Sequence, residues 1–210
     1  MVNSHKPMGA CHDAGSYILN QNQKEGGRLA ETLYFAYGSN MNLDQMDFRC
    51  PAAEVVGNVR LDDYRLAFCS QNPESGVATI LPEKGSHVDG VLWRITGACE
   101  KSLNRYEGYP YLYGKKTIHV RAEDGTAYQC MVYVMNVPHK DYPARPSDFY
   151  LHGIIEGCKQ NGIPTEPIMD AVCRTEKEVK ARNAKSRKKG MGAVIHADIR
   201  LSSAGCCSCS

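Results

Sequence analysis

The stretch that decides the fold is Leu33-Tyr34-Phe35-Ala36-Tyr37-Gly38-Ser39-Asn40, in which a short apolar and aromatic run stops at a glycine. Aromatic residues in such a run are typical of a buried strand, so we predict a strand over residues 33–37. Gly38-Ser39-Asn40 ends the strand, and Asn42 is placed to cap a short helix over residues 42–46. The sequence therefore predicts a polar turn that leads from a buried strand directly into a helix.

More strands are expected downstream of this turn. Alternating or continuous apolar residues predict strands over residues 55–61, 64–70, 78–81, 87–95, 117–121 and 128–135. The first two of these flank Asp62-Asp63 and are interpreted as neighbouring strands. The last two are joined through Glu123-Asp124-Gly125, a typical turn, and predict a hairpin.

Two longer helices are expected among these strands. Residues 98–106 carry Cys99, Leu103 and Tyr106 at i, i+4 and i+7, which predicts that one face of this helix packs on the core. Residues 147–160 begin with a serine that can cap a helix. Because the strands are mostly antiparallel and show no repeating βα rhythm, the fold class is α+β, built on a curved or closed sheet.

Two segments contain residues suited to chemistry. The turn Tyr37-Gly38-Ser39-Asn40 offers backbone N–H groups and polar side chains that can hold a carboxylate or a developing oxyanion, and a plain strand-to-helix turn is the alternative. Glu107 is expected at the C-terminus of the helix over residues 98–106, which Gly108 can end by taking the left-handed conformation. At that position the helix dipole and the neighbouring tyrosines would raise the pKa of Glu107. A solvated glutamate at a helix end is the alternative.

Composition gives an ordinary globular chain of 210 residues, with 42% hydrophobic residues and a net charge of +2. This charge is too small to indicate nucleic acid as a partner. Residues 1–27 contain no continuous apolar run typical of a signal peptide, and no stretch is long and apolar enough to span a membrane. With seven of the ten cysteines scattered singly, we expect free thiols and a cytoplasmic location.

Both ends of the chain differ from its middle. Residues 1–30 show no sustained periodicity and are interpreted as a flexible tail, followed by a domain over residues 31–173 that ends in a short helix over residues 165–173. Residues 174–210 are interpreted as a basic tail, because Arg174 to Lys189 holds eight Lys or Arg residues and only two acids. The tail ends with Cys206, Cys207 and Cys209.

Taken together, the turn and Glu107 resemble the γ-glutamylcyclotransferase family, also described as AIG2-like. The resemblance rests on residues 33–41, on Leu103-Asn104-Arg105-Tyr106-Glu107-Gly108-Tyr109-Pro110 with Tyr113, on Pro146-Ser147 with Tyr150, and on Asn161-Gly162-Ile163-Pro164. It covers about residues 32–173. It implies a small mixed, largely antiparallel β-barrel with flanking helices and a cavity at one end.

The resemblance also implies an activity and the residues that carry it. Glu107 would act as general acid and base while the α-amine of a γ-glutamyl substrate attacks its own γ-carbonyl and releases 5-oxoproline with an amino acid or amine. Residues 37–40, namely Tyr37, Gly38, Ser39 and Asn40, would hold the glutamyl group, and Tyr113 and Tyr150 would form walls of the pocket. No cofactor and no metal is required for this reaction.

Several alternatives stay open. The partner expected is a small γ-glutamyl molecule and not a nucleic acid, and the sequence makes no prediction about the oligomeric state. The chain departs from the family pattern at Pro167, and residues 164–167 are therefore expected to decide the leaving group. The substrate could instead be a γ-glutamylamine or a γ-glutamyl-protected biosynthetic intermediate. A non-catalytic module that binds small ligands on the same fold is the other possibility.

Overall fold

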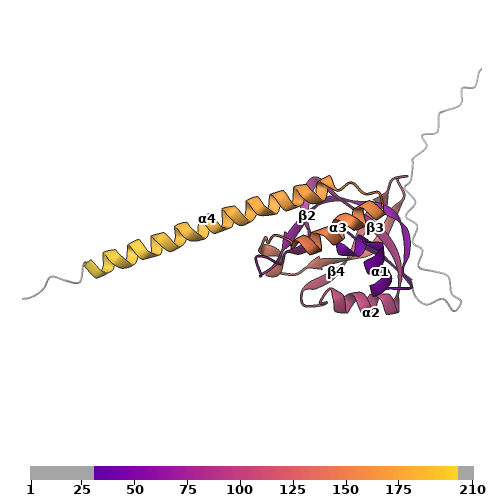
Figure 1. Cartoon of the computed structure of the whole chain (residues 1–210), viewed down its shortest axis with the longest axis horizontal. Helices are drawn as coiled ribbons and strands as arrows, with labels where there is room; N and C mark the ends of the chain where they lie inside the picture. Colours follow the sequence, from indigo (N-terminus) through magenta and orange to yellow (C-terminus); the bar gives the residue numbers. More distant parts are fainter. Residues whose placement is uncertain (1–30, 203–210) are drawn as a thin grey trace, which may run out of the picture.

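A closed barrel of five strands forms the centre of the molecule in the computed structural model, which describes residues 31–202 and their side chains up to residue 187 (Figure 1). The strands are β1 (Glu31–Ala36), β2 (Glu54–Cys69), β3 (Val77–Thr96), β4 (Tyr113–Ala122) and β5 (Ala127–Met135), in the spatial order β1-β3-β2-β4-β5. Neighbours pair antiparallel except β1 and β5, whose parallel pairing at Tyr34 and Met131 closes the barrel. This confirms the α+β class and the largely antiparallel mixed barrel.

The long β2–β3 hairpin corrects part of the predicted strand pattern. Residues 55–61 and 64–70 were expected as neighbouring strands, but they are successive parts of β2, and residues 78–81 and 87–95 are likewise parts of β3. The pairing register shifts between Asp62 and Tyr64, where Asp63 adopts a positive φ of 61° and accepts a hydrogen bond from the backbone N–H of Gly85 at 2.8 Å. Such an irregularity bends a strand without ending it, so Asp62-Asp63 marks a bulge and not a turn.

The short helices begin and end at the predicted signals. The turn after β1 forms the 3-10 helix η1 (Ser39–Met41), and α1 (Leu43–Arg49) follows, with Asn42 accepting from the backbone N–H of Gln45 at its N-cap. α2 (Gly97–Tyr106) ends where Gly108 takes a positive φ of 62°. A second 3-10 helix, η2 (His139–Asp141), precedes α3 (Asp148–Gln160), which Ser147 caps.

The core fills the barrel and extends under α3. Phe35, Leu92 and Ile95 are fully buried inside, and Ile154 of α3 is buried with them. α3 packs so closely on η1 that a Cβ added at Gly157 would come within 2.6 Å of the backbone nitrogen of Asn42. The small residue in α3 thus fixes the turn that follows β1 against the end of the barrel.

The last helix, α4 (Glu166–Ser202), begins on the barrel and extends far beyond it (Figure 1). Its first turns are anchored by buried side chains and by the ion pair between Arg65 and Glu178 at 3.1 Å, and Arg182 lies 4.1 Å from the ring centroid of Tyr142. The expected boundary after residue 173 therefore falls inside a continuous helix. Within residues 31–202, no helix is both long and apolar enough to cross a membrane. The predicted tail over residues 1–30 and the three terminal cysteines lie outside the described residues.

Candidate active site

The turn after β1 is held in place from several sides. The indole N–H of Trp93 donates to the backbone carbonyl of Asn40 at 3.1 Å, and the side chain of Asn161 donates to the carbonyl of Met41 at 2.8 Å. Gly38 lies close to two other segments, because an added Cβ would sit 3.2 Å from the Cβ of Ala78 and 3.4 Å from the hydroxyl of Tyr150. These contacts give the polar residues of the turn a fixed geometry.

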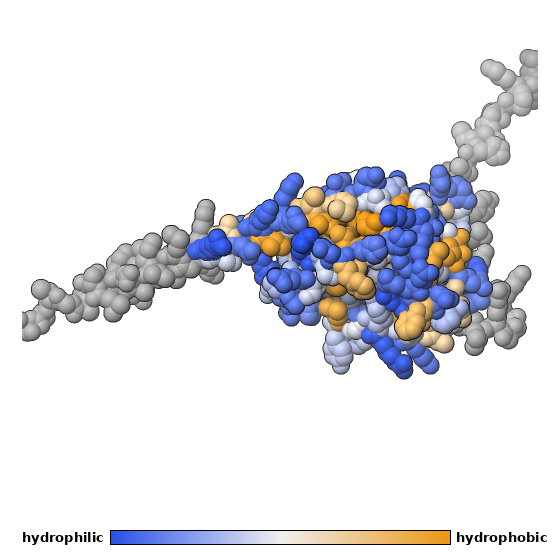
Figure 2. All heavy atoms as spheres, in the orientation of Figure 1, coloured by the Kyte–Doolittle hydropathy of each residue, from blue (hydrophilic) through white to orange (hydrophobic). Residues whose placement is uncertain are grey.

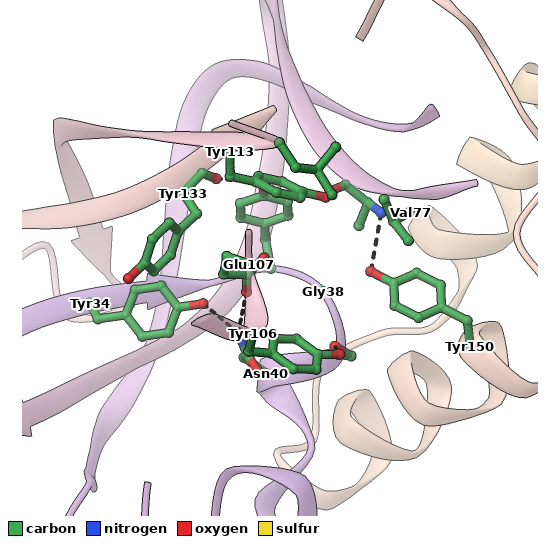
Figure 3. A pocket seen from close by; sticks show the side chains of 13 residues that line it. Tyr34, Gly38, Asn40, Val77, Tyr106, Glu107, Tyr113, Tyr133 and Tyr150 are labelled. Carbon is green, nitrogen blue, oxygen red and sulfur yellow. Dashed lines mark hydrogen bonds between the residues drawn. The ribbon is translucent and has the colours of Figure 1, made fainter. Parts of the chain in front are cut away.

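Glu107 reaches this turn from the end of α2. Its Oε1 accepts a hydrogen bond of 2.7 Å from Nδ2 of Asn40, and the same nitrogen donates to the hydroxyl of Tyr34 at 2.8 Å (Figure 3). The chain folds so that two residues 67 positions apart share this bond, because α2 packs beside β3 with Cys99 and Leu103 buried beneath it. The structure therefore brings together the two features that the sequence singled out.

Burial raises the pKa of Glu107 to about 7, while the hydrogen bond from Asn40 and the charge of Arg49 act in the opposite direction. The predicted direction of the shift is thus reproduced, but its surroundings differ from those expected. Tyr109 and Tyr111, which follow Glu107 in sequence, are 40% and 86% exposed and do not line the cavity that Glu107 faces. That cavity is enclosed mainly by tyrosines from distant strands and from α3.

A cavity of about 210 Å³ opens where the turn, Glu107 and these tyrosines meet (Figure 3). All seven residues that the sequence proposed for the site line it. Its walls are Tyr34, Tyr37, Gly38, Ser39, Asn40, Val77, Ala78, Tyr106, Glu107, Leu112, Tyr113, Tyr133 and Tyr150. The described lining residues contain one ionisable carboxylate, that of Glu107, among otherwise neutral groups.

Two predicted wall residues, Tyr113 and Tyr150, converge on the backbone of Ala78 from opposite sides. The hydroxyl of Tyr113 donates to the carbonyl of Ala78 at 2.5 Å, and the hydroxyl of Tyr150 accepts from its N–H at 3.1 Å. Burial raises the pKa of both phenols well above their usual range, so both stay neutral near neutral pH. Both tyrosines line the cavity with their hydroxyls already hydrogen-bonded; Tyr113 is buried, and Tyr150 is partly buried against the core.

Besides the apolar lining residues Val77, Ala78 and Leu112, sequence reasoning missed four side chains at or beside this site, those of Tyr34, Arg49, Tyr106 and Tyr133. Tyr106 was expected in the core, but its side chain is 46% exposed at the cavity, where its hydroxyl lies 3.1 Å from Oγ of Ser39 and Arg49 stacks on its ring. Tyr34 and Tyr133 line the cavity from β1 and β5. No local pattern identifies Tyr133, because its place in the site depends on the closure of the barrel.

The segment from Pro164 to Pro167 does not lie where the sequence suggested. Both prolines line a second cavity of about 320 Å³, between the start of α4 and the middle of the β2–β3 hairpin. Neither is among the lining residues of the first cavity. The prediction that this segment shapes the leaving-group side of the pocket is therefore not supported, because the turn after α3 leads away from η1 and into α4.

Comparison with known proteins agrees with this geometry. A family model described as "Gamma-glutamyl cyclotransferase, AIG2-like" matches residues 34–151. The gamma-glutamylcyclotransferase of Mus musculus is 35% identical over 148 residues, covering 67% of this chain and 77% of the relative. The Homo sapiens protein of the same name is 34% identical over 141 residues, covering 64% and 73%.

Solved structures show the same similarity. One described as a gamma-glutamyl cyclotransferase has a TM-score of 0.59 and 32% identity, over 72% of this chain and 88% of that one. The match over residues 34–151 contains the turn, Glu107 and the walls contributed by Tyr113 and Tyr150. The chain belongs to the γ-glutamylcyclotransferase family.

Proposed function

We propose that the protein is an enzyme, a γ-glutamylcyclotransferase that converts γ-glutamyl compounds to 5-oxoproline and an amino acid or amine. The observation that carries the proposal is the Glu107 carboxylate, which faces a cavity beside the turn at residues 37–40 and has a pKa of about 7. A carboxylate with this pKa can both accept and return a proton near neutral pH. The relatives named gamma-glutamylcyclotransferase support the same activity.

In the proposed reaction, Glu107 takes one proton from the α-ammonium group of the substrate. The freed amine attacks the γ-carbonyl carbon, so that a new C–N bond closes a five-membered ring. Glu107 then passes its proton to the leaving nitrogen as the original C–N bond breaks. The second proton lost by the ring nitrogen leaves on the released amine, which departs as an ammonium ion. Since nucleophile and carbonyl belong to one molecule, holding the substrate in a folded conformation supplies much of the catalysis.

The turn at residues 37–40 is proposed to hold the glutamyl group. The backbone and side chains of Ser39 and Asn40 would bind the α-carboxylate and the carbonyl oxygen, where negative charge develops during the attack. Tyr113 and Tyr150 would confine the substrate, because their hydroxyls are already fixed on the backbone of Ala78. A wall whose polar groups are satisfied selects by shape more than by new hydrogen bonds.

The proposal is tested by Glu107→Gln, which keeps the size of the side chain and removes the base. We expect the rate of 5-oxoproline release from γ-glutamyl-amino acids to fall by about 10²–10⁴-fold. Glu100→Gln is the matched control, because Glu100 lies on the same helix and pairs with Lys115 outside the cavity. Unchanged 5-oxoproline release in Glu107→Gln would refute the assignment of Glu107.

The leaving group is decided by a substrate panel. γ-Glutamyl dipeptides, glutathione and γ-glutamylamines are incubated with the wild-type protein, and 5-oxoproline is measured. Cleavage of the dipeptides in preference to the amines would identify amino acids as the physiological leaving groups, and the reverse preference would identify amines. Binding of panel members without release of 5-oxoproline would instead favour a non-catalytic module.

A cytoplasmic location is part of the same proposal. It is supported by the described cysteines, which are free thiols, five of them buried, as expected in a reducing compartment. Cell fractionation of the tagged full-length chain tests this location. Recovery of the protein in a secreted fraction would contradict it.

A further inference from the structure

We propose that Arg49 is a positioning residue, which locks the amide of Asn40 so that its nitrogen, and not its oxygen, faces the carboxylate of Glu107. This inference rests on the proposed role of Glu107. Arg49 is the last residue of α1 and does not line the cavity itself. It would therefore act through Asn40 and not by touching the substrate.

The guanidinium of Arg49 is held by four neighbours. Its Nη1 donates to Oδ1 of Asn40 at 2.5 Å and to Oγ of Ser39 at 3.3 Å. Its Nη2 donates to Oε1 of Gln45 at 2.6 Å, and the guanidinium carbon lies 3.6 Å from the ring centroid of Tyr106. A planar guanidinium whose two terminal nitrogens both donate hydrogen bonds, and which stacks on an aromatic ring, has little freedom to rotate.

The chemistry of the guanidinium decides how the Asn40 amide is oriented. Arginine offers only hydrogen-bond donors, so the amide must present its oxygen to Arg49. The NH₂ group on the opposite side of the amide then has to face Glu107 and Tyr34, as the bonds of 2.7 and 2.8 Å show. Without Arg49 the amide could rotate by half a turn and place its oxygen against the carboxylate, an arrangement that favours the protonated acid.

Arg49 also supplies positive charge near an otherwise neutral cavity. The other titratable groups whose charges interact with Glu107 are phenols of β1, the turn after it, β4, β5 and α3, namely Tyr34, Tyr37, Tyr113, Tyr133 and Tyr150. Burial keeps these phenols neutral near neutral pH. The Asn40 bond and the Arg49 charge both lower the pKa of Glu107 against the effect of burial. Loss of Arg49 should therefore remove both and raise that pKa further.

A purely structural role makes a different prediction. If Arg49 only fastens α1 to η1, its replacement would lower the melting temperature and leave the titration of Glu107 unchanged. The informative variant is Arg49→Met, which retains a long side chain over Tyr106 but removes the charge and the donors. Arg49→Lys retains the charge, and Arg60→Met is the matched control, because Arg60 pairs with Asp89 on the surface of the barrel.

The experiment has two readouts. The first is the titration of the Glu107 carboxyl carbon by ¹³C NMR in the substrate-free protein, with the signal assigned by its absence in Glu107→Gln. The second is the acid limb of kcat/KM against pH. In Arg49→Met we expect both to move upward by about one pH unit, a roughly tenfold loss of kcat/KM on the acid side. Arg60→Met should stay near wild type, and Arg49→Lys, which retains the charge and a donor but not the planar fork, should move less than Arg49→Met.

An unmoved Glu107 titration in a folded Arg49→Met protein would overturn the inference. If that variant does not fold, Arg49→Leu, which also removes the charge and the donors, gives the same decision. The NMR titration needs no catalytic activity. A wild-type protein that releases no 5-oxoproline would therefore refute the proposed function while the role of Arg49 is still decided by the titration.

Discussion

Two of the cavities on this barrel have their charged groups arranged in opposite ways. The cavity of about 210 Å³ at the end of β1 contains Glu107, whose pKa burial raises to about 7. The larger cavity of about 320 Å³ beside α4 is lined by Arg65 and Arg174, and both arginines pair with Glu83. The pKa of Glu83 is lowered by its hydrogen bonds from Ser86 and Arg174.

The difference shows that size does not identify the reactive site. In the larger cavity each arginine has acidic partners, and exposure to water screens the charges further. On the face drawn in Figure 2, hydrophobic and hydrophilic residues lie side by side. In the smaller cavity, burial leaves Glu107 poised between its two protonation states, which is the property that a general base requires.

The largest effect expected from this comparison is on the pH dependence of activity. The base must be deprotonated to act, so kcat/KM should fall as pH drops below the Glu107 pKa of about 7. Between pH 7, where half of the Glu107 carboxyl groups are deprotonated, and pH 5 we expect a loss of about 50-fold. Glu83→Gln should leave this limb in place. A profile of kcat/KM against pH that stays flat down to pH 5 would contradict the assignment of Glu107 as a base with a raised pKa.

The second effect is on stability and has opposite signs at the two glutamates. The folded pKa of Glu107 lies above its ordinary value of 4.5, so wild-type stability declines as pH rises between these values. Glu107→Gln should therefore increase the free energy of unfolding by about 3 kcal/mol at pH 8, with the gain disappearing at pH 4.

For Glu83 the folded pKa is lowered, so its contribution is present at neutral pH and is lost on acidification. Glu83→Gln should be slightly less stable than wild type at pH 8, by less than about 1 kcal/mol. Urea denaturation of wild type and both variants at pH 4 and pH 8 measures the two differences. A change in the free energy of unfolding that has the same sign in both variants at pH 8 would contradict the environments assigned to Glu107 and Glu83.

The smallest effect is expected at Arg174. Its hydrogen bonds to Glu83, at 2.9 and 3.1 Å, form on a side chain that is 45% exposed. Arg174→Gln should cost less than about 1 kcal/mol in the free energy of unfolding and leave 5-oxoproline release unchanged. A marked loss of activity in this variant would instead couple the second cavity to the first.

Local signals predicted the parts of this molecule whose causes are local. Asn42, Ser147 and Gly108 set helix boundaries through their own side chains or backbone, and the structure confirms all three. Asp62-Asp63 misled the strand assignment because acidic residues suit both a turn and a bulge. Only the pairing of β2 with β3 both before and after Asp62-Asp63 distinguishes a bulge from a turn.

The residues of the site likewise divide into those that local sequence predicted and those that depend on distant segments. Glu107 and the turn at residues 37–40 could be proposed from sequence, because each is recognisable within its own short stretch of the chain. The turn lies in a family-like motif, and Glu107 lies at a predicted helix end. Tyr106 was misplaced in the core, since helical periodicity does not reveal that Arg49 of another helix stacks on its ring. The position of Pro167 at the second cavity depends on the direction in which α4 leaves the barrel.

The sequence by itself thus determined the α+β class, the helix caps, the polar turn after β1 and the candidate base. Tertiary structure alone decided the environment of that base. Closure of β1 on β5 brings Tyr34 and Tyr133 to the same cavity, and the packing of α1 beside η1 brings Arg49 to Asn40. The physical reason is that burial and hydrogen bonding depend on which distant segments meet, and these two effects set the pKa of Glu107.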